Sequence, residues 1–280
     1  MPGYIDKVLH RYCPDGVRGA ASPMIYTPPR YGSSAPQLVA APDTSPPCTP
    51  AEHNRLQQII GCLLYYGRAL DCTYLTSVCA LSSAQAHATH SVLADAARLL
   101  SYASTHRDSS LVFTACDMVL HTHSDGSYLS RPNGTSVAGG LHFLGNRDDP
   151  MAINGPIHAD SMQIPIVTAS AAETEYAALF MNGQHASWLR HVLTEIGYPQ
   201  PTTSIVCDNT TAVGIANDQG KARRSKYMDM RLHWIRDRVR QGQFSVLWRP
   251  GTHNLADFFT KPLPVVAHRA VEHFYARRRT

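Results

Sequence analysis

The architecture of this chain follows from the stretch TSIVCDNTTAVGIA, Thr203 to Ala216. It begins with a short apolar run, Ile205-Val206-Cys207, of the length and composition expected of a buried strand. Asp208-Asn209 ends the run, and Thr210 to Ala216 has the pattern of a helix start. Such an aspartate lies where open α/β sheets bind their ligands, just outside the carboxyl edge. This stretch alone leaves two interpretations open for Asp208, a ligand-binding carboxylate and a simple helix N-cap.

Length and composition indicate an ordinary globular protein with two structural units. The chain has 280 residues, of which 44% are hydrophobic and 16% charged, and its net charge is +4. Seven cysteines occur without a C-x-x-C pair or zinc spacing, and no signal-peptide pattern opens the sequence. We therefore expect reduced thiols and an intracellular location, cytoplasmic or nuclear. No apolar run approaches the roughly 18 residues of a membrane span, so no membrane partner is expected.

The chain changes character twice, which predicts its domain organisation. Residues 1–48 are a proline-rich, partly extended segment with a short helix at 4–12. Residues 49–109 carry helical stripes and begin with Thr49-Pro50-Ala51-Glu52, a capping-box sequence with proline at the first helical position. Residues 110–265 form an α/β domain, and residues 266–280 are a basic C-terminal tail.

Within the α/β domain, periodicity and turn residues predict an alternation of strands and helices. Strands are expected at 110–116 and 118–124, either pairing or forming one bent strand, and at 135–144, 151–163, 205–207 and 244–248. Helices are expected at 170–196, 210–216, 224–240 and 254–262. The order β-β-β-α-β-α-α-β-α is that of an α/β fold.

Four carboxylates occupy matching places in this order. Asp125 and Asp208 end strands, Glu175 begins the long helix and Asp257 begins the last one. If the strands of Asp125 and Asp208 are parallel neighbours, a right-handed crossover brings Glu175 to the same edge. We expect the four to converge with no cation of the chain to neutralise them, which favours two bound Mg²⁺ ions or Mn²⁺. The alternative for Glu175 is a first-turn glutamate favoured by the helix dipole.

Several motifs together resemble a known family. They are HSDGS (123–127), SAAETEYAAL (170–179), VCDNT (206–210), RSKYMDMR (224–231) and ADFFTK (256–261). This set resembles the ribonuclease H domain of copia-type LTR retrotransposon polyproteins and covers about residues 118–262. Residues 1–7 and 59–65 resemble the segment between the reverse transcriptase palm and ribonuclease H, while the palm itself is absent. The chain is therefore expected to be the C-terminal fragment of a polyprotein, or a gene derived from one.

The resemblance implies a fold and a function. The fold is a ribonuclease H-like mixed five-stranded sheet with helices on both faces, preceded by a small helical region. The function is a metal-dependent endonuclease that hydrolyses the RNA strand of RNA–DNA hybrids during reverse transcription, in a retrotransposon particle or the nucleus, together with the remainder of the polyprotein. The metal-binding and catalytic roles transfer to Asp125, Glu175, Asp208 and Asp257. Glu173 is the competing glutamate, and His253, in the loop before Asp257, receives no catalytic role.

A basic stretch, residues 221–240, follows the Asp208 helix. It contains eight lysines or arginines against two aspartates. Its first four cations are expected in a loop that precedes a helix. We expect them to bind the phosphates of the hybrid without recognising its base sequence. They are Lys221, Arg223, Arg224 and Lys226. The alternative is a solvated helix face, the usual fate of a charge run.

Two further interpretations remain open. The domain is a catalytically silent nucleic-acid-binding or scaffold remnant of a polyprotein if the element has lost its function. Alternatively, His121, His123 and Asp125 share one strand face and form a transition-metal site. Histidines beside a buried sheet are more commonly hydrogen-bonded core residues, which argues against the transition-metal site.

Overall fold

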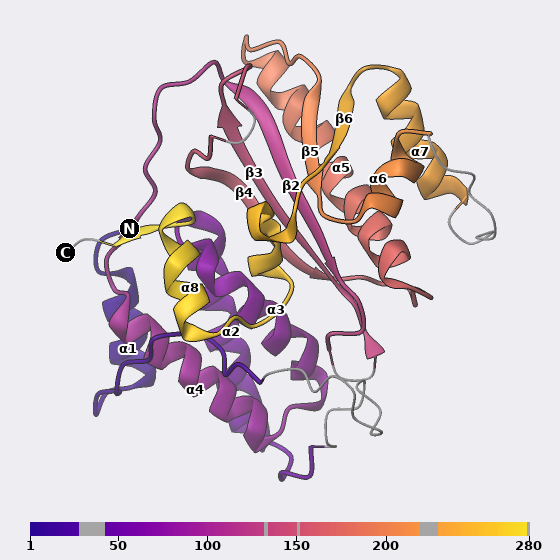
Figure 1. Cartoon of the computed structure of the whole chain (residues 1–280). Coiled ribbons are helices and arrows are strands. Elements are labelled where there is room, and N and C mark those ends of the chain that lie inside the picture. The colour runs from indigo at the N-terminus through magenta and orange to yellow at the C-terminus, as the bar shows by residue number, and fades with distance from the viewer. Residues whose placement is uncertain (28–42, 132–133, 150–151, 219–228, 279–280) are drawn as a thin grey trace. The chain divides into compact units, whose positions relative to one another are not determined.

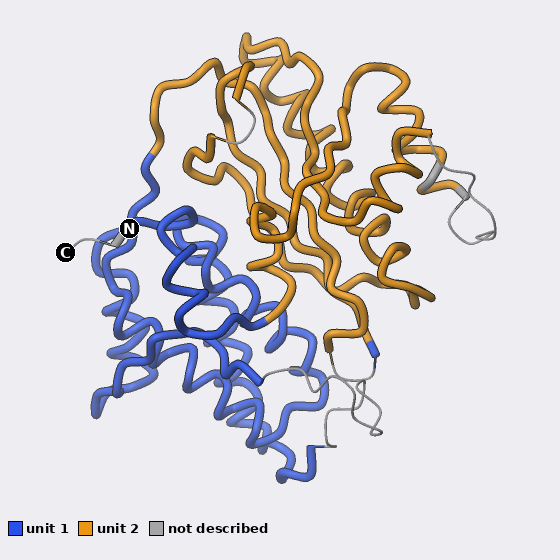
Figure 2. Tube along the Cα trace, in the orientation of Figure 1, with its two compact units in different colours: residues 1–112, 132–134, 262–280 blue, residues 113–131, 135–261 orange. Residues whose placement is uncertain are grey.

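The computed structural model describes residues 1–27, 43–131, 134–149, 152–218 and 229–278 (Figure 1). The chain divides into two compact units, shown in Figure 2. Unit 1 contains residues 1–112, 132–134 and 262–280, and unit 2 contains residues 113–131 and 135–261. The segment at 266–280 therefore belongs to the helical unit. Among the described residues, no helix is long and apolar enough to cross a membrane.

Unit 1 is helical. Its helices are α1 (Tyr4–Tyr12), α2 (Pro50–Ala69), α3 (Leu75–Ala84), α4 (His90–Thr105) and α8 (Val265–Val271), with 3-10 turns η1 (Cys72–Tyr74), η2 (Gln85–His87) and η6 (Glu272–Phe274). The capping box predicted at the start of α2 is present: the Thr49 hydroxyl accepts from the Glu52 N–H, and the Glu52 carboxylate accepts from the Thr49 N–H. Leucines from α2, α3 and α4 are buried together in one core with residues of α1.

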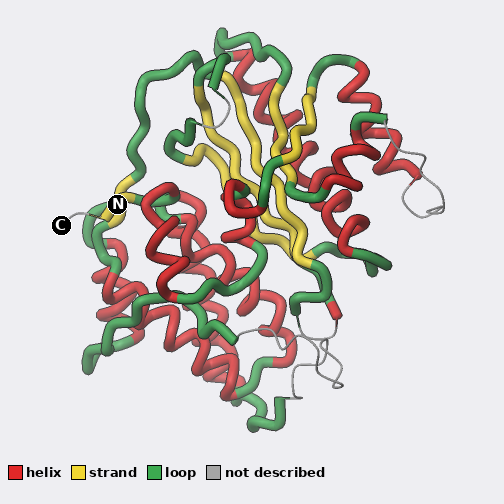
Figure 3. The backbone as a smooth tube through the Cα atoms, in the orientation of Figure 1, coloured by secondary structure: helices red, strands yellow, loops and turns green. Residues whose placement is uncertain are grey.

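Unit 2 is built on a five-stranded sheet (Figure 3). The strands are β2 (Val119–Ser127), β3 (Val137–Gly145), β4 (Pro156–Gln163), β5 (Thr203–Cys207) and β6 (Phe244–Trp248). Their order in the sheet is β4-β3-β2-β5-β6. The first three pair antiparallel, whereas β2–β5 and β5–β6 are parallel. The predicted mixed five-stranded sheet is confirmed, and so is the parallel pairing of the strands before Asp125 and Asp208.

Both faces of the sheet are covered. Two adjacent glycines of β3, Gly139 and Gly140, show which elements lie against each face. A Cβ on Gly140 would lie 1.9 Å from the side-chain oxygen of Asn182, on α5 (Ala171–Glu195). A Cβ on Gly139 would lie 2.5 Å from the Ala256 carbonyl oxygen, on η5 (Leu255–Phe259). Since adjacent strand residues face opposite ways, α5 covers one face and η5 the other. Helices α6 (Thr210–Ala216) and α7 (Asp229–Arg240) and the turn η4 (Gly251–His253) complete the unit.

One predicted strand is wrong. Within 110–116 only Ser110 is extended in a ladder, in the two-residue strand β1 (Ser109–Ser110), which pairs with β7 (Arg277–Arg278) in unit 1. The rest of the run has strand-like composition but no neighbouring strand. The backbone N–H and carbonyl of Thr114 bond instead to the side-chain amide of Asn154, at 2.9 and 3.0 Å.

Candidate active site

Strand pairing places Asp125 and Asp208 side by side. In the parallel ladder of β2 and β5, His123 is level with Val206. Asp125 and Asp208 each follow these partners by two residues, so the two are neighbours at the carboxyl end of β5. The prediction that Asp125 ends its strand is wrong, because β2 continues to Ser127, paired with β3. Asp125 is buried, with 4% of its surface exposed, and Asp208 is partly exposed.

Glu175 reaches the same edge from the first turns of α5. The helix begins after Ser170, whose hydroxyl accepts from the Glu173 N–H at 3.2 Å. Gly126 admits the helix backbone next to Asp125, because a Cβ there would lie 2.8 Å from the Thr174 carbonyl oxygen. The ligand atoms of Glu175, Cys207 and Asp208 lie within 4.8 Å of one another.

Asp257 lies on the 3-10 turn η5. Asn254 starts this turn by accepting from the Ala256 N–H, and its amide donates to the Ser124 carbonyl of β2 at 2.8 Å. The buried hydroxyl of Thr260 then donates to Asp125 Oδ2 at 2.7 Å. These two bonds hold η5 against β2, so that the charge of Asp257 acts on Asp125.

The pKa values show that the carboxylates share one electrostatic environment. Burial, followed by the charge of Asp257, raises the pKa of Asp125 to about 7. Burial, followed by the charges of Asp125 and Asp208, raises the pKa of Glu175 to about 10. Burial also raises the pKa of Asp208, although a hydrogen bond from Glu175 opposes the rise. The structure therefore brings all four predicted carboxylates to one edge of the sheet.

The expectation that no cation of the chain would neutralise this cluster is wrong. Lys261 Nζ lies 2.5 Å from Asp257 Oδ1, one helical turn further along the chain. Burial lowers the pKa of Lys261, but contact with Asp257 and the field of Asp125 and Asp208 raise it overall. The sequence signal for this pair was its i,i+4 spacing, which the motif quoted above contains. One ammonium among four carboxylates still leaves an excess of acidic groups.

Contacts in the structure bear on three competing interpretations of single residues. Asn209, rather than Asp208, caps α6 by accepting from the Ala212 N–H at 3.0 Å, so the simple N-cap interpretation of Asp208 is wrong. Glu173 accepts from the Ala169 N–H at 2.5 Å and serves the start of α5. His253 is exposed, and its Nδ1 lies 3.1 Å from the Thr252 hydroxyl.

The histidines of β2 are core residues with hydrogen-bond partners. The two ring nitrogens of His121 lie 2.8 Å from the Ser204 hydroxyl and 3.0 Å from the Asn146 carbonyl. His123 Nδ1 accepts from the Leu255 N–H, and burial lowers the pKa of His123 to about 4. In the part of the chain that the structure describes, neither belongs to a group with convergent metal-ligand atoms.

The predicted phosphate-binding residues lie outside the described residues; they are Lys221, Arg223, Arg224 and Lys226. Among the cations that follow them on α7, Arg236 and Arg240 pair with Asp218, at 3.4 and 2.6 Å. Arg231 and Arg238 stack over the rings of Phe180 and Trp234, respectively. These contacts within the unit favour a structural role for the α7 cations.

Comparison with known proteins relates this chain to retrotransposon polyproteins. No family model matches it. It is 33% identical over 110 residues to the retrovirus-related Pol polyprotein of transposon TNT 1-94 from Nicotiana tabacum, covering 39% of this chain and 8% of that protein. It is 28% identical over 157 residues to the Pol polyprotein of transposon RE2 from Arabidopsis thaliana, covering 52% of this chain and 11% of that protein.

A yeast relative extends the match along the chain. The Ty1-DR5 Gag-Pol polyprotein of Saccharomyces cerevisiae is 24% identical over 219 residues, covering 76% of this chain and 12% of the polyprotein. The chain thus spans about a tenth of the length of the curated relatives it matches. The resemblance to a retrotransposon polyprotein, stated from the motifs, is confirmed.

Solved structures similar to this chain cover about half of it. One is LC11-RNase H1 in complex with an RNA/DNA hybrid, with a TM-score of 0.38, 15% identity and coverage of 50% of this chain and 93% of that one. Another is the PFV RNase H domain, with a TM-score of 0.35, 15% identity and coverage of 50% and 91%.

Proposed function

We propose that this chain is a metal-dependent endonuclease that hydrolyses the RNA strand of RNA–DNA hybrids. The observation that carries the proposal is the convergence of Asp125, Glu175, Asp208 and Asp257, from four different elements, on one sheet edge. A buried cluster of carboxylates is unfavourable unless protons or cations neutralise it. The relatives add support, because they are retrovirus-related Pol polyproteins and a transposon Gag-Pol polyprotein.

The donor set fits divalent magnesium or manganese. All four groups offer carboxylate oxygens, which Mg²⁺ and Mn²⁺ prefer as hard cations. The pKa values of about 7 and about 10 at Asp125 and Glu175 indicate that protons do the neutralising when no metal is present. We assign two metal ions to the site, where they would lower the pKa of a bound water and stabilise the leaving oxygen.

The chain's own residues orient these ligands. Thr260 fixes one oxygen of Asp125 by donating a hydrogen bond, which leaves the other oxygen for a cation. Lys261 contacts Asp257 Oδ1 and so orients that side chain, and its ammonium would also attract a phosphate of the substrate. The Trp248 indole donates to the Asp208 carbonyl at 2.9 Å and so holds the backbone at this strand end.

The substrate proposal extends to the basic residues that precede α7 in the sequence and to the other unit. Lys221, Arg223, Arg224 and Lys226 would hold phosphates of the hybrid, and 2′-hydroxyl contacts would distinguish its RNA strand. We assign residues 49–109 to a connection resembling the end of a reverse transcriptase, whose remaining polyprotein would be the natural partner. Retrotransposon particles or the nucleus would then be the place of action.

Hydrolysis of a strand-labelled hybrid tests this proposal. Wild-type protein should cut the RNA strand with Mg²⁺ or Mn²⁺, leave the DNA strand intact, and stop when EDTA is added. Asp208→Asn keeps the shape of the side chain and removes its charge, so it should remain folded by circular dichroism and lose cleavage. Equal cleavage by the variant and wild type would refute the assignment. Hybrid binding without any cleavage by wild type would instead support the silent scaffold.

A further inference from the structure

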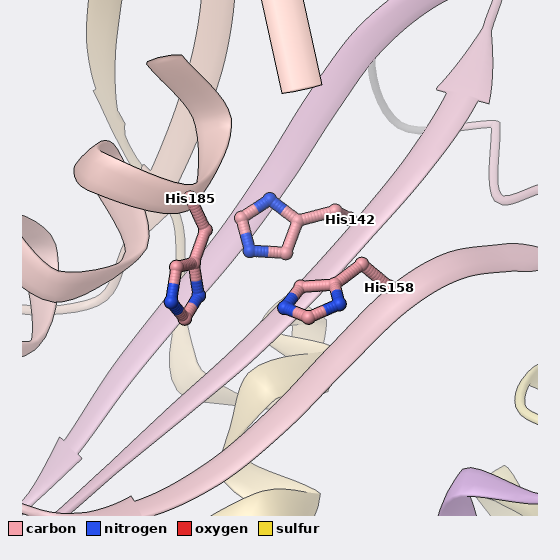
Figure 4. A group of neighbouring side chains, drawn as sticks. All are labelled: His142, His158 and His185. Atoms are coloured by element: carbon pink, nitrogen blue, oxygen red, sulfur yellow. The ribbon is translucent and has the colours of Figure 1, made fainter. Parts of the chain in front are cut away.

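Three histidines from different elements of unit 2 converge beside the sheet (Figure 4). They are His142 on β3, His158 on β4 and His185 on α5. The rings of His158 and His185 have centroids 5.0 Å apart, and those of His142 and His158 are separated by 5.4 Å. One ligand nitrogen from each residue lies within 4.8 Å of the others. Neither the carboxylate site nor the motifs of the sequence account for this cluster.

A buried carboxylate lies against two of these rings. The side chain of Asp160 is only 1% exposed, and its Oδ2 lies 2.5 Å from His158 Nε2 and 2.8 Å from His185 Nδ1. A carboxylate buried to this extent needs a positive charge or several donors beside it. The two histidine side chains retain 28% and 35% exposure, so an ion from solvent can reach them.

The third ring, that of His142, is fully buried and lies beside the side chains of Thr122 and Asn182. The hydroxyl of Thr122 lies 2.9 Å from its Nδ1, which can donate to that oxygen and leave a lone pair on Nε2. In the part of the chain that the structure describes, Nε2 has no hydrogen-bond partner of ordinary geometry. The Asn182 side chain also interacts with the ring, and since its amide nitrogen donates to Ser124 and the Gly139 carbonyl, its oxygen is the interacting atom; a metal ion at Nε2 would replace this contact.

We propose that this cluster binds one transition-metal ion of the zinc type, held by nitrogens of His142, His158 and His185 and an oxygen of Asp160. Imidazole nitrogens with one carboxylate suit Zn²⁺ rather than Mg²⁺. Tetrahedral bonds of about 2.0–2.1 Å set ligand atoms about 3.3 Å apart. The histidine nitrogens, which lie within 4.8 Å of one another, must therefore adjust to that spacing, and the contacts of Asp160 with two of them must lengthen by less than about 1 Å. The partly exposed His158 and His185 side chains have room to adjust to this spacing.

The site is distinct from the four carboxylates in place and in chemistry. Thr122 and His142 are paired across β2 and β3 on the face covered by α5, whereas Asp125 faces η5. The proposed ion would join the edge strand β4 to β3 and α5. Its role is therefore structural: it would cross-link a sheet edge to the helix that carries Glu175.

Cobalt substitution of the full chain tests the proposal. Chelator-treated protein in excess Mg²⁺, which occupies the carboxylates, is titrated with Co²⁺ and then with Zn²⁺. The expected result is one Co²⁺ per chain with visible tetrahedral absorption and no thiolate charge-transfer band, displaced by one Zn²⁺. Zn²⁺ should also raise the melting temperature.

Variants of the cluster decide whether these residues are the ligands. His158→Gln and His185→Gln should abolish the Co²⁺ spectrum, while His191→Gln, an exposed histidine of the same helix, should leave it unchanged. Thr122→Val removes the partner of His142 and should weaken Zn²⁺ binding about 10- to 100-fold. Circular dichroism of each variant verifies folding.

Three outcomes would overturn the proposal. They are no tetrahedral Co²⁺ spectrum in the wild type, a spectrum that survives His158→Gln and His185→Gln, and a thiolate band, which would place the ion at Cys207 or another cysteine. Each would leave the histidines and Asp160 as a hydrogen-bonded ionic cluster.

Discussion

Without metal, Asp125 is about half protonated at neutral pH, whereas Glu175 is almost fully protonated. Burial, with neighbouring carboxylates, raises the pKa of Asp125 to about 7 and that of Glu175 to about 10. Unfolding would return both to ordinary values near 4. The folded protein without metal thus holds more protons than the unfolded chain between about pH 4 and those values.

This difference predicts the pH dependence of stability without metal. The stabilising contribution of both groups is fully present below about pH 4 and is lost as pH rises, first through about 7 for Asp125 and then toward about 10 for Glu175. Each group should lower the free energy of unfolding by up to about 1.4 kcal/mol per pH unit in its window. Urea denaturation in EDTA at pH 5 to 8 measures the slope.

Magnesium provides the control for that slope. Divalent ions replace the bound protons, so added Mg²⁺ should stabilise the protein more at pH 8 than at pH 5. A stability that rises with pH over this range in EDTA, or a Mg²⁺ effect independent of pH, would contradict the assignment of raised pKa values to this cluster.

The sequence predicted the acidic residues of the site but only part of their surroundings. Asp208 and Glu175 follow from local signals, because they lie just after a strand and in the first turns of a helix, whereas Asp125 lies two residues before the end of β2. Thr260 contacts Asp125 across 135 positions of the chain, and only the docking of η5 creates that bond. The histidine cluster was not predicted for the same reason: its members lie on β3, β4 and α5, and no local pattern joins them.

At the scale of elements, the close approach of η5 to β3 depends on Gly139. A Cβ there would lie 2.5 Å from the Ala256 carbonyl and 2.8 Å from the Thr260 side chain. Gly139→Ala should therefore displace η5, lower stability by about 1–3 kcal/mol and reduce cleavage, because Asp257 lies on the displaced turn. Denaturant unfolding and the hybrid assay measure the two effects.

Gly214 offers a matched control in the same unit. It lies in α6, and a Cβ at this position would meet no atom within 4 Å. Gly214→Ala should stabilise the protein by about 0.5–1 kcal/mol through helix propensity and leave cleavage unchanged. If both substitutions have the same effect, the close contact at Gly139 does not position η5.

Elements with strong local signals were predicted closely, and those that depend on a partner were not. Strand β6 was predicted at 244–248 and occupies Phe244–Trp248, and the capping box correctly placed the start of α2. The run at 110–116 also contains residues that favour strands, yet beyond Ser110 it has no neighbouring strand with which to form a ladder. Propensity alone therefore could not distinguish a strand from an extended connection.

At the scale of the whole molecule, unit 2 contains its own sheet and the elements that cover both faces of it. All five strands, α5 and η5 lie within residues 113–261. A fragment of these residues should fold cooperatively and bind Mg²⁺, because every described contact of the four carboxylates lies inside it. Circular dichroism and urea denaturation measure folding, with the full chain as the reference.

An unfolded or aggregated fragment would show that residues of unit 1 are needed for the fold of unit 2. Cleavage is a separate question for this fragment, since the helical unit would help to hold the hybrid in the proposed enzyme. The fragment therefore tests whether unit 2 folds independently, and the cleavage reaction is tested with the full-length protein.

The central claim is that carboxylates at this sheet edge hold metal ions that cleave RNA. The most direct measurement compares Glu175→Gln with Glu173→Gln in full-length protein on a labelled RNA–DNA hybrid with Mg²⁺. The two positions lie two residues apart on α5, and only Glu175 reaches the cluster, while Glu173 bonds the Ala169 N–H. Glu175→Gln should lower the cleavage rate by about a hundredfold or more, and Glu173→Gln should cut at the wild-type rate. Equal rates for both variants and wild type would contradict the claim.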